Sequence, residues 1–262
     1  MATKSPVTPE EVTDELIFAE LMSQGFKDID GTKRRRVVAS IEGKEGTGKT
    51  FLACTADGPI IYFDIDIGTE GVVEQFQDGS NGITPRRILR KRIRIPKGES
   101  KDTYESLWNE VWQMAETAYK LKRGAVIWDT GSELYELCRL ARYGKLAQVP
   151  PHYYQLANND WRDFARLAYD SDMSTILIHK VKPVWVNNNR TNEYEPSGFS
   201  ETPYMVQVRL STFRNQTDDG AVFGFKILKC RPKDSLVGET VAGPMSSFPF
   251  LLNLIYGKEA KK

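Results

Sequence analysis

Near the start of the chain, the stretch GKEGTGKT from Gly43 to Thr50 combines glycines with a lysine and a threonine in a set order. It fits the pattern G-x-x-x-x-G-K-[ST] and follows an apolar run, RVVASI, that we expect to be a strand. Glycines let successive backbone N–H groups turn toward one anion, and Lys49 can then reach the β- and γ-phosphates. The Thr50 hydroxyl is the expected ligand of Mg²⁺. The stretch therefore predicts a loop that binds ATP with Mg²⁺, the alternative being a chance glycine-rich turn.

The residues expected to contact the nucleotide are Gly43, Lys44, Glu45, Gly46, Thr47, Gly48, Lys49, Thr50 and Phe51. A second acidic position is needed to orient the metal, and Asp129 fits it. In AVIWDT, apolar residues run into Asp129 at the expected carboxyl end of a strand, where open α/β sheets place their ligands. The alternative is an aspartate that caps the next helix, but Ser132 can fill that role. We therefore expect Thr50 and Asp129 to hold the metal.

Hydrolysis also needs a group that orients or deprotonates the attacking water. The stretch YFDIDIGTEG offers Asp64, Asp66 and Glu70 just past a second expected strand. If the strand alternates, Asp64 and Asp66 share a face, and Asp66 lies nearer the open end. We expect Asp66 to be the base, with Asp64 and Glu70 as competitors. The other interpretation is that these acids cap or solvate a turn.

A sheet must bring these positions together. The runs RVVASI, PIIYFDID, GAVIWDT and STILIHK are short, apolar and β-branched or aromatic, as buried strands are. Helical patterns lie between them, including a long helix from Asp102 whose apolar stripe contains Trp108 and Trp112, more typical of packing than of base stacking. Near the end, YMVQVRLST and AVFGFKILKC, separated by the polar FRNQTDDG, predict a hairpin. The order predicts an α/β fold with a mostly parallel central sheet flanked by helices.

Composition limits the remaining choices. The 262 residues are 40% hydrophobic, enough for one large core plus a small appendage, which we divide as a tail and helix over 1–29, a main domain over 30–256 and a tail over 257–262. The formal net charge of +1 means that any nucleic-acid binding must come from local patches. Three scattered cysteines predict a reducing compartment, and two isolated histidines argue against zinc. With no signal core or membrane-length apolar run, we expect a cytoplasmic protein that does not bind membranes.

The order GKEGTGKT, YFDID, VIWDT, ILIHK and a hairpin ending in ILKCR resembles the core of RecA/RadA-type recombinases. It looks most like the compact phage-encoded RecA-like AAA family ATPases implicated in single-strand DNA annealing and recombination. The similarity covers roughly 36–256, and only the first motif is specific alone. The resemblance implies a Mg²⁺-dependent, DNA-stimulated ATPase that forms homo-oligomers in the host cytoplasm. It also implies single-stranded DNA as a partner, with a single-strand DNA-binding protein as a further candidate.

Three roles follow from this resemblance. A carboxylate after the second strand activates water, which falls on Asp66, although the family more often has Glu there. A polar residue ending the strand after the metal-binding strand senses the γ-phosphate, which falls on His179; without the family, His179 is equally a structural histidine. A K-x-R pair at the end of a late strand reaches the neighbouring subunit's site, which falls on Lys229 and Arg231. The alternative for this pair is an ordinary solvated basic turn.

Two segments are candidates for DNA contact. The basic strip PRRILRKRIRIPK, from Pro85 to Lys97, can neutralise phosphates, or it can be an edge strand protected by charge. The polar segment Val184–Tyr204 resembles in placement the family's second DNA-binding loop, and we expect it to lack regular structure. Its aromatic residues Trp185, Tyr194 and Phe199 are suited to stacking on bases, although acids outnumber its basic residues.

Three other functions share these motifs. A ring-forming helicase or translocase uses the same core, including the basic pair. A small-molecule P-loop kinase needs an arginine-bearing lid, which the segment from Ile83 to Lys97 could imitate. A nucleotide-gated scaffold that barely hydrolyses ATP is the third, since Asp66 replaces the expected glutamate.

Overall fold

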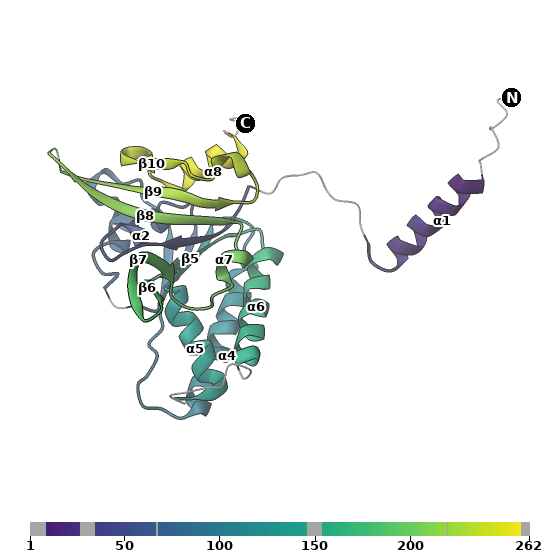
Figure 1. Cartoon of the computed structure of the whole chain (residues 1–262), viewed down its shortest axis with the longest axis horizontal. Helices are drawn as coiled ribbons and strands as arrows, with labels where there is room; N and C mark the ends of the chain where they lie inside the picture. Colours follow the sequence, from purple (N-terminus) through teal and green to yellow (C-terminus); the bar gives the residue numbers. More distant parts are fainter. Residues whose placement is uncertain (1–8, 27–34, 67, 146–153, 219, 258–262) are drawn as a thin grey trace. The chain divides into compact units, whose positions relative to one another are not determined.

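The structure is a computed structural model of the chain, and it describes residues 9–26, 35–66, 68–145, 154–218 and 220–257. The chain divides into two compact units, Met1–Arg34 and Arg35–Lys262. In the first unit, helix α1 (Pro9–Ser23; purple in Figure 1) exposes large apolar side chains, among them Leu16 and Phe18. The second unit contains every residue of the candidate site.

The second unit is built on one large sheet. Its strands are β1 (Val38–Glu42), β2 (Ile60–Asp64), β3 (Ile88–Arg92), β4 (Ala125–Asp129), β5 (Ser174–His179), β8 (Val208–Thr217), β9 (Gly220–Cys230) and β10 (Thr240–Ala242). In the described part of the chain they form an eight-stranded sheet in the order β10-β9-β8-β1-β5-β4-β2-β3. The strands from β8 to β3 in this order run parallel, whereas β9 is antiparallel to both of its neighbours, β8 and β10. The predicted α/β class, with a mostly parallel sheet and a late antiparallel hairpin, is confirmed.

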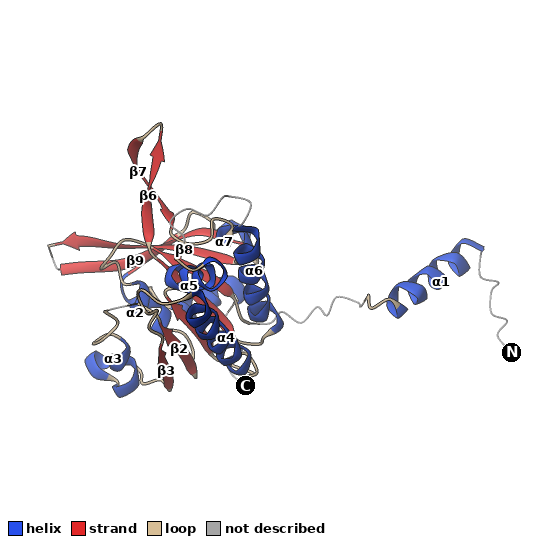
Figure 2. Ribbon diagram, turned by 90° about the horizontal axis from the view of Figure 1, so that it is seen from below, coloured by secondary structure: helices blue, strands red, loops and turns tan. Residues whose placement is uncertain are grey.

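Helices cover both faces of this sheet. They are α2 (Lys49–Cys54), α3 (Val73–Asp78), α4 (Lys101–Ala118), α5 (Gly131–Tyr143), α6 (Tyr154–Asp170), α7 (Thr202–Met205) and α8 (Phe248–Tyr256), with 3-10 turns at Ser80–Gly82, Asp234–Leu236 and Gly243–Met245. Apolar residues of α2, α3 and α8 form one core cluster with the sheet, and those of α4, α5 and α6 form the other (Figures 1 and 2).

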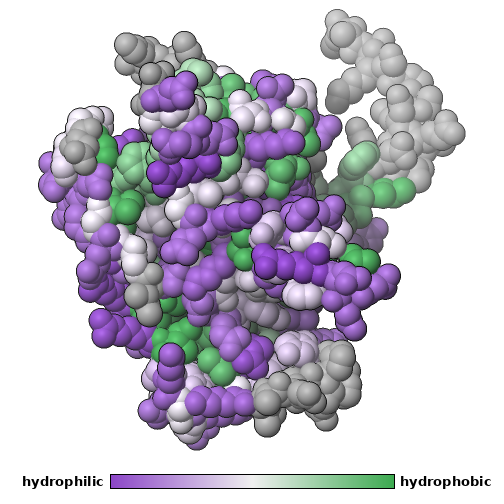
Figure 3. Space-filling view, turned by 60° about the vertical axis from the view of Figure 1, so that its left-hand side comes forward, coloured by the Kyte–Doolittle hydropathy of each residue, from purple (hydrophilic) through white to green (hydrophobic). Residues whose placement is uncertain are grey.

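The strand sequences explain why two cores form. Strand β1 is buried along its whole length because β5 and β8 flank it and both of its faces are covered, as a continuous apolar run predicts. Its side chains alternate, so that Ile41 joins the α2 side and Val38 the α4–α6 side. Trp108 packs in the second core, with its ring 5.4 Å from that of Phe164. The outer face seen in Figure 3 is mainly hydrophilic, with hydrophobic residues in separate patches.

Two hairpins differ from the expectations. The polar stretch expected to link the last two long strands is itself mostly strand, since β8 continues to Thr217 and β9 starts at Gly220. This hairpin extends past the other strands in Figure 1, where both faces are open to water and polar side chains can pair. The segment Val184–Tyr204 was expected to lack structure, but much of it belongs to the hairpin of β6 (Val181–Val186) and β7 (Asn189–Pro196). Its turn uses Asn187 and Asn188 in the left-handed conformation that two-residue hairpin turns require.

Candidate nucleotide-binding and active site

The glycine-rich loop joins β1 to α2, as the sequence pattern requires. Gly46 and Gly48 have φ values of 71° and 85°, a conformation that favours glycine. Gly43 lies against β8, and a Cβ there would come within 2.3 Å of Thr212 Oγ1. Thr212 also shares a 2.7 Å hydrogen bond with Thr47 of the loop. The hairpin of β8 and β9 therefore supports the loop from one side and fixes where its backbone amides lie.

Lys49 folds back over this loop. Its Nζ donates hydrogen bonds to the carbonyl oxygens of Gly43, at 2.9 Å, and Lys44, at 2.8 Å. Burial lowers the pKa of Lys49, and the charge of Lys180 adds to that effect, whereas Asp129, Asp66 and Glu45 oppose it. Lys49 is therefore partly removed from water and lies against the loop, where an anion bound by the loop would meet its charge.

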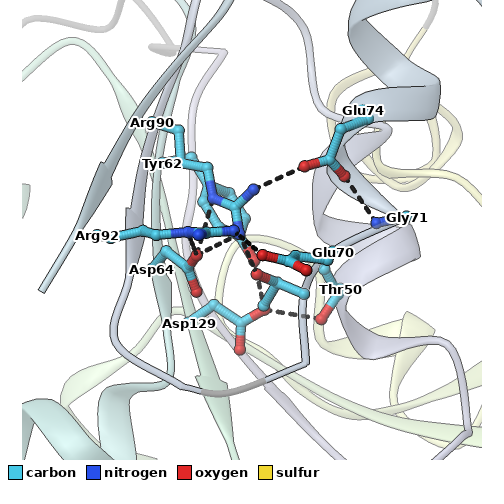
Figure 4. Close-up of polar contacts among 10 residues, drawn as sticks. Thr50, Tyr62, Asp64, Glu70, Gly71, Glu74, Arg90, Arg92 and Asp129 are labelled. Atoms are coloured by element: carbon cyan, nitrogen blue, oxygen red, sulfur yellow. Dashed lines mark hydrogen bonds and ion pairs between the residues drawn. The ribbon is translucent and has the colours of Figure 1, made fainter. Parts of the chain in front are cut away.

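Thr50 and Asp129 meet although 79 residues separate them. The Thr50 hydroxyl donates a 2.7 Å hydrogen bond to Asp129 Oδ2, and the buried Tyr62 hydroxyl donates to the same oxygen at 2.6 Å (Figure 4). Burial raises the pKa of Asp129, and the two hydroxyl donors oppose that rise. Sequence analysis missed Tyr62, whose signal is only an aromatic residue two positions before Asp64.

These oxygen donors suit magnesium. The ion prefers hard oxygen ligands and usually takes one or two from protein, with phosphates and water supplying the rest. The described residues include no cluster of three or more His, Cys, Asp and Glu side chains that could hold a metal on its own. A hydroxyl and a carboxylate beside a phosphate-binding loop therefore fit the expected Mg²⁺ chemistry.

The three acids at and after the end of β2 differ in their contacts. Asp64 is buried and paired with Arg90 and Arg92 of β3, and Glu70 is paired with Arg92 (Figure 4). The backbone of Asp66 is joined to the end of β4, because its N–H donates a 3.0 Å hydrogen bond to the Asp129 carbonyl oxygen. Asp64 and Glu70 are thus held by arginines of β3, and the role of Asp66 as the base stays a prediction.

Lys180 is a residue of this site that the sequence analysis missed. It follows directly after β5, and its Nζ lies 3.1 Å from Asp66 Oδ1 and 2.8 Å from Glu133 Oε1. Burial would lower the pKa of Lys180, but hydrogen bonds and attraction from Glu133 and Asp66 outweigh it and raise the pKa. Only the adjacent His179 carried a signal in the sequence, because the partners of Lys180 are distant along the chain.

His179 is buried at the end of β5. Its side chain is 1% exposed, and Nδ1 lies 3.1 Å from the Ser197 carbonyl oxygen. A Cβ on Gly131 would come within 3.0 Å of the imidazole, so the ring lies against the start of α5. Burial lowers the pKa of His179 to about 4, which keeps it neutral near pH 7. These contacts fit the structural-histidine alternative, and the expected role of His179 as a γ-phosphate sensor stays a prediction.

Lys229 and Arg231 lie at the opposite edge of the sheet from the loop. Val208 pairs with Ala39 near the amino end of β1 and with Cys230 at the end of β9, whereas the loop follows the carboxyl end of β1. Lys229 Nζ donates to the Pro203 carbonyl oxygen at 2.6 Å, and Arg231 donates to that of Tyr204. The pair cannot reach its own chain's loop, so a role in trans stays a prediction.

Much of the basic strip is used within the fold. Arg90 bonds Asp64, Thr69 and Glu74, and so ties β3 to the segment that carries Asp66 (Figure 4). Arg86 donates to the Ala56 carbonyl oxygen. These contacts favour the charged edge strand over a DNA-binding strip.

A cleft of 730 Å³ opens beside Asp66. It is lined by Asp64, Ile65, Asp66, Gly68, Thr69, Glu70, Arg90, Arg92, Ile93, Arg94, Ile95, Lys97, Glu133 and Lys180. The Lys180–Asp66 pair therefore borders an open space rather than a sealed core.

The hairpin of β6 and β7 contacts the loop. Lys44 Nζ lies 4.4 Å from the centre of the Tyr194 ring, a cation–π contact. Near the turn, the Trp185 side chain is 62% exposed. Phe199, expected to stack on bases, is instead buried, with its ring 5.7 Å from that of Tyr135. Among the described residues, no helix combines the length and the apolar character needed to cross a membrane.

No family model matches the sequence, and no curated protein is similar to it. Similar solved structures include the flagellar accessory protein FlaH from Methanocaldococcus jannaschii, with 14% identity and a TM-score of 0.45. A KaiC-like protein from Pyrococcus horikoshii OT3 has 11% identity and a TM-score of 0.45. Each comparison covers 79% of this chain and 84% of the other. At such identities, the function of this chain has to be argued from its own residues.

Proposed function

We propose that this chain is a Mg²⁺-dependent ATPase of the RecA-like class. The observation that carries the proposal is the 2.7 Å hydrogen bond between Thr50 and Asp129 at the end of a glycine-rich loop. A chance glycine-rich turn gives no reason for a buried carboxylate from another strand to meet the threonine of the motif. The same arrangement is expected wherever a loop holds phosphates and a metal together.

Each residue has a defined task in hydrolysis. The backbone amides of the loop and Lys49 bind the phosphates, and Thr50 and Asp129 hold the metal. Bound Mg²⁺ would supply positive charge that offsets the negative charge of the phosphates. Asp66, joined through its backbone to Asp129, orients the attacking water and accepts its proton.

Single-stranded DNA is the partner that we assign to the hairpin of β6 and β7. Exposed Trp185 near its turn can stack on a base, and base stacking does not depend on sequence. The contact between Lys44 and Tyr194 links this hairpin to the nucleotide loop, which gives DNA a route to influence turnover. The biological role would be phage-type recombination or annealing by a homo-oligomer, with Lys229 and Arg231 acting on the neighbouring subunit. A helicase or translocase would use the same parts.

One observation favours a second candidate, a small-molecule P-loop kinase. The 730 Å³ cleft beside Asp66 falls within the range of about 300–1,000 Å³ typical of small-ligand sites. In a kinase, Asp66 would accept a proton from a substrate hydroxyl instead of water.

The ATPase rate with and without single-stranded DNA, measured across a salt series on protein of known solution mass, separates these functions. We expect turnover that DNA stimulates, with a stimulation that falls as salt rises. Turnover that ignores DNA and rises with a metabolite would favour the kinase. Strand separation on a forked substrate would favour the helicase.

A further inference from the structure

Lys180 contacts the candidate base Asp66 as well as joining the end of β5 to α5 through Glu133. It follows β5, and β5 lies between the strand that leads into the loop and the strand that ends in Asp129. Its ammonium is 3.1 Å from the carboxylate of Asp66. Lys180 is therefore placed between the residues proposed to bind the phosphates and the residue proposed to activate water.

The electrostatic surroundings of Lys49 point to the same space. The charges that act on Lys49 include those of Asp129, Asp66 and Lys180. Two ammonium groups and two carboxylates from four separate segments thus converge beside one loop. The γ-phosphate of a nucleotide held by this loop is an anion that would attract both ammonium groups.

The simpler alternative is that Lys180 only joins the end of β5 to α5 through Glu133. Its side chain is 44% exposed and borders the open cleft, and exposed ion pairs of this kind contribute little to stability. A purely structural ion pair would not need to include the candidate base. The exposure also means that a ligand can reach the ammonium.

From this geometry we infer that Lys180 is a catalytic residue that acts in cis, with its ammonium contacting the γ-phosphate of the nucleotide bound to its own chain. The inference rests on the proposed ATPase function and adds a residue to it. Glu133 is the positioning residue that holds the lysine, at 2.8 Å.

The proposed step is hydrolysis of the bond between the β- and γ-phosphates of ATP. The oxygen of water forms a bond to the γ-phosphorus while the bond from that phosphorus to the β–γ bridging oxygen breaks. The electron pair of the broken bond leaves with ADP, and the proton of water goes to Asp66 and then to solvent. Lys180 keeps its proton and stabilises the negative charge on the γ-phosphate oxygens as the bonds change.

The test compares Lys180→Ala, Lys180→Arg and a matched control, Lys122→Ala, which removes another lysine from an exposed ion pair, with Asp172. We expect K180A to lower kcat by about a hundredfold, as loss of a transition-state donor typically does, with K180R retaining more activity and K122A unchanged. ADP lacks the γ-phosphate, so K180A should bind ADP normally and bind a non-hydrolysable ATP analogue more weakly.

Unchanged kcat in K180A, or equal weakening of ADP and analogue binding, would overturn the inference. Wild-type protein that does not hydrolyse ATP would instead overturn the proposed function. The ATPase rate of a mixture of K180A and Lys49→Ala proteins tests whether Lys180 acts on its own chain or on a neighbouring one. A cis residue predicts no recovery, whereas recovered activity would show that the lysine acts on a neighbour.

Discussion

The two edges of the main sheet surround their basic residues differently. At the carboxyl edge, Lys49 lies near Asp129 and Asp66, and Lys180 contacts Asp66 directly. At the amino edge, Lys229 and Arg231 donate to main-chain oxygens of the turn at Pro203 and Tyr204. Cations held among carboxylates suit a ligand of the same chain. Cations that donate to neutral main-chain oxygens keep their full charge and remain suited to an anionic ligand brought by another molecule.

Under the proposed function, Lys180 would serve the site of its own chain, whereas Lys229 and Arg231 would serve the site of a neighbouring subunit. An interface in which one edge of a subunit meets the opposite edge of the next is heterologous, and such contacts build rings or filaments. Substitutions at the two edges test whether their basic residues have these separate roles.

The largest effect is expected from Lys229→Ala with Arg231→Ala. Loss of a trans-acting basic finger typically costs about three orders of magnitude in rate, which a steady-state ATPase assay measures. Mixing this double variant with K49A should restore activity, because the intact site of one chain then meets the intact pair of the other. Full activity of the double variant alone would show that the amino edge plays no part in catalysis.

A smaller loss is expected from Asp66→Asn. Removing a general base typically costs about a hundredfold in kcat, and ATP affinity should change little because the phosphate contacts remain. The exposed Asp57 supplies the control, Asp57→Asn, which should be neutral. If D66N keeps its rate, the base must be another group, and the carboxyl-edge account loses its central acid.

The smallest effect is expected from Trp185→Ala on the hairpin. Loss of one stacking platform weakens single-stranded DNA binding by about 1–3 kcal/mol, which fluorescence anisotropy can measure. DNA-free turnover should be unaffected, and Leu156→Ala, another exposed apolar position, is the control. Equal DNA affinity in both variants would remove the hairpin from the DNA interface.

The loop and the meeting of Thr50 with Asp129 were predictable because their signals are local. The glycine pattern fixes backbone chemistry over eight residues, and the apolar run before Asp129 marks the end of a buried strand. The sheet was predictable for the same reason, since its strands are short apolar runs between glycines and prolines. The edge strand β3 was open to two interpretations because a charged strand and a phosphate-binding strip have the same composition.

The residues that were missed depend on contacts between distant segments. Lys180 meets Asp66 and Glu133 only in the folded protein. Tyr62 meets Asp129 because β2 and β4 are neighbours in the sheet. The burial of His179 was not predictable, because the surroundings of a strand's last residue depend on packing that composition does not show. The hairpin of β6 and β7 was missed because β6 contains a proline and β7 is polar and mostly exposed, although its paired asparagines are a turn signal.

ATP affinity in wild-type protein and in Lys49→Ala, measured by calorimetry with Mg²⁺, tests the central claim most directly. Lys49 supplies a charged donor to the phosphates, so we expect its loss to weaken ATP binding by about a hundredfold and to reduce hydrolysis to background. A K49A protein that binds and hydrolyses ATP like the wild type would contradict the account.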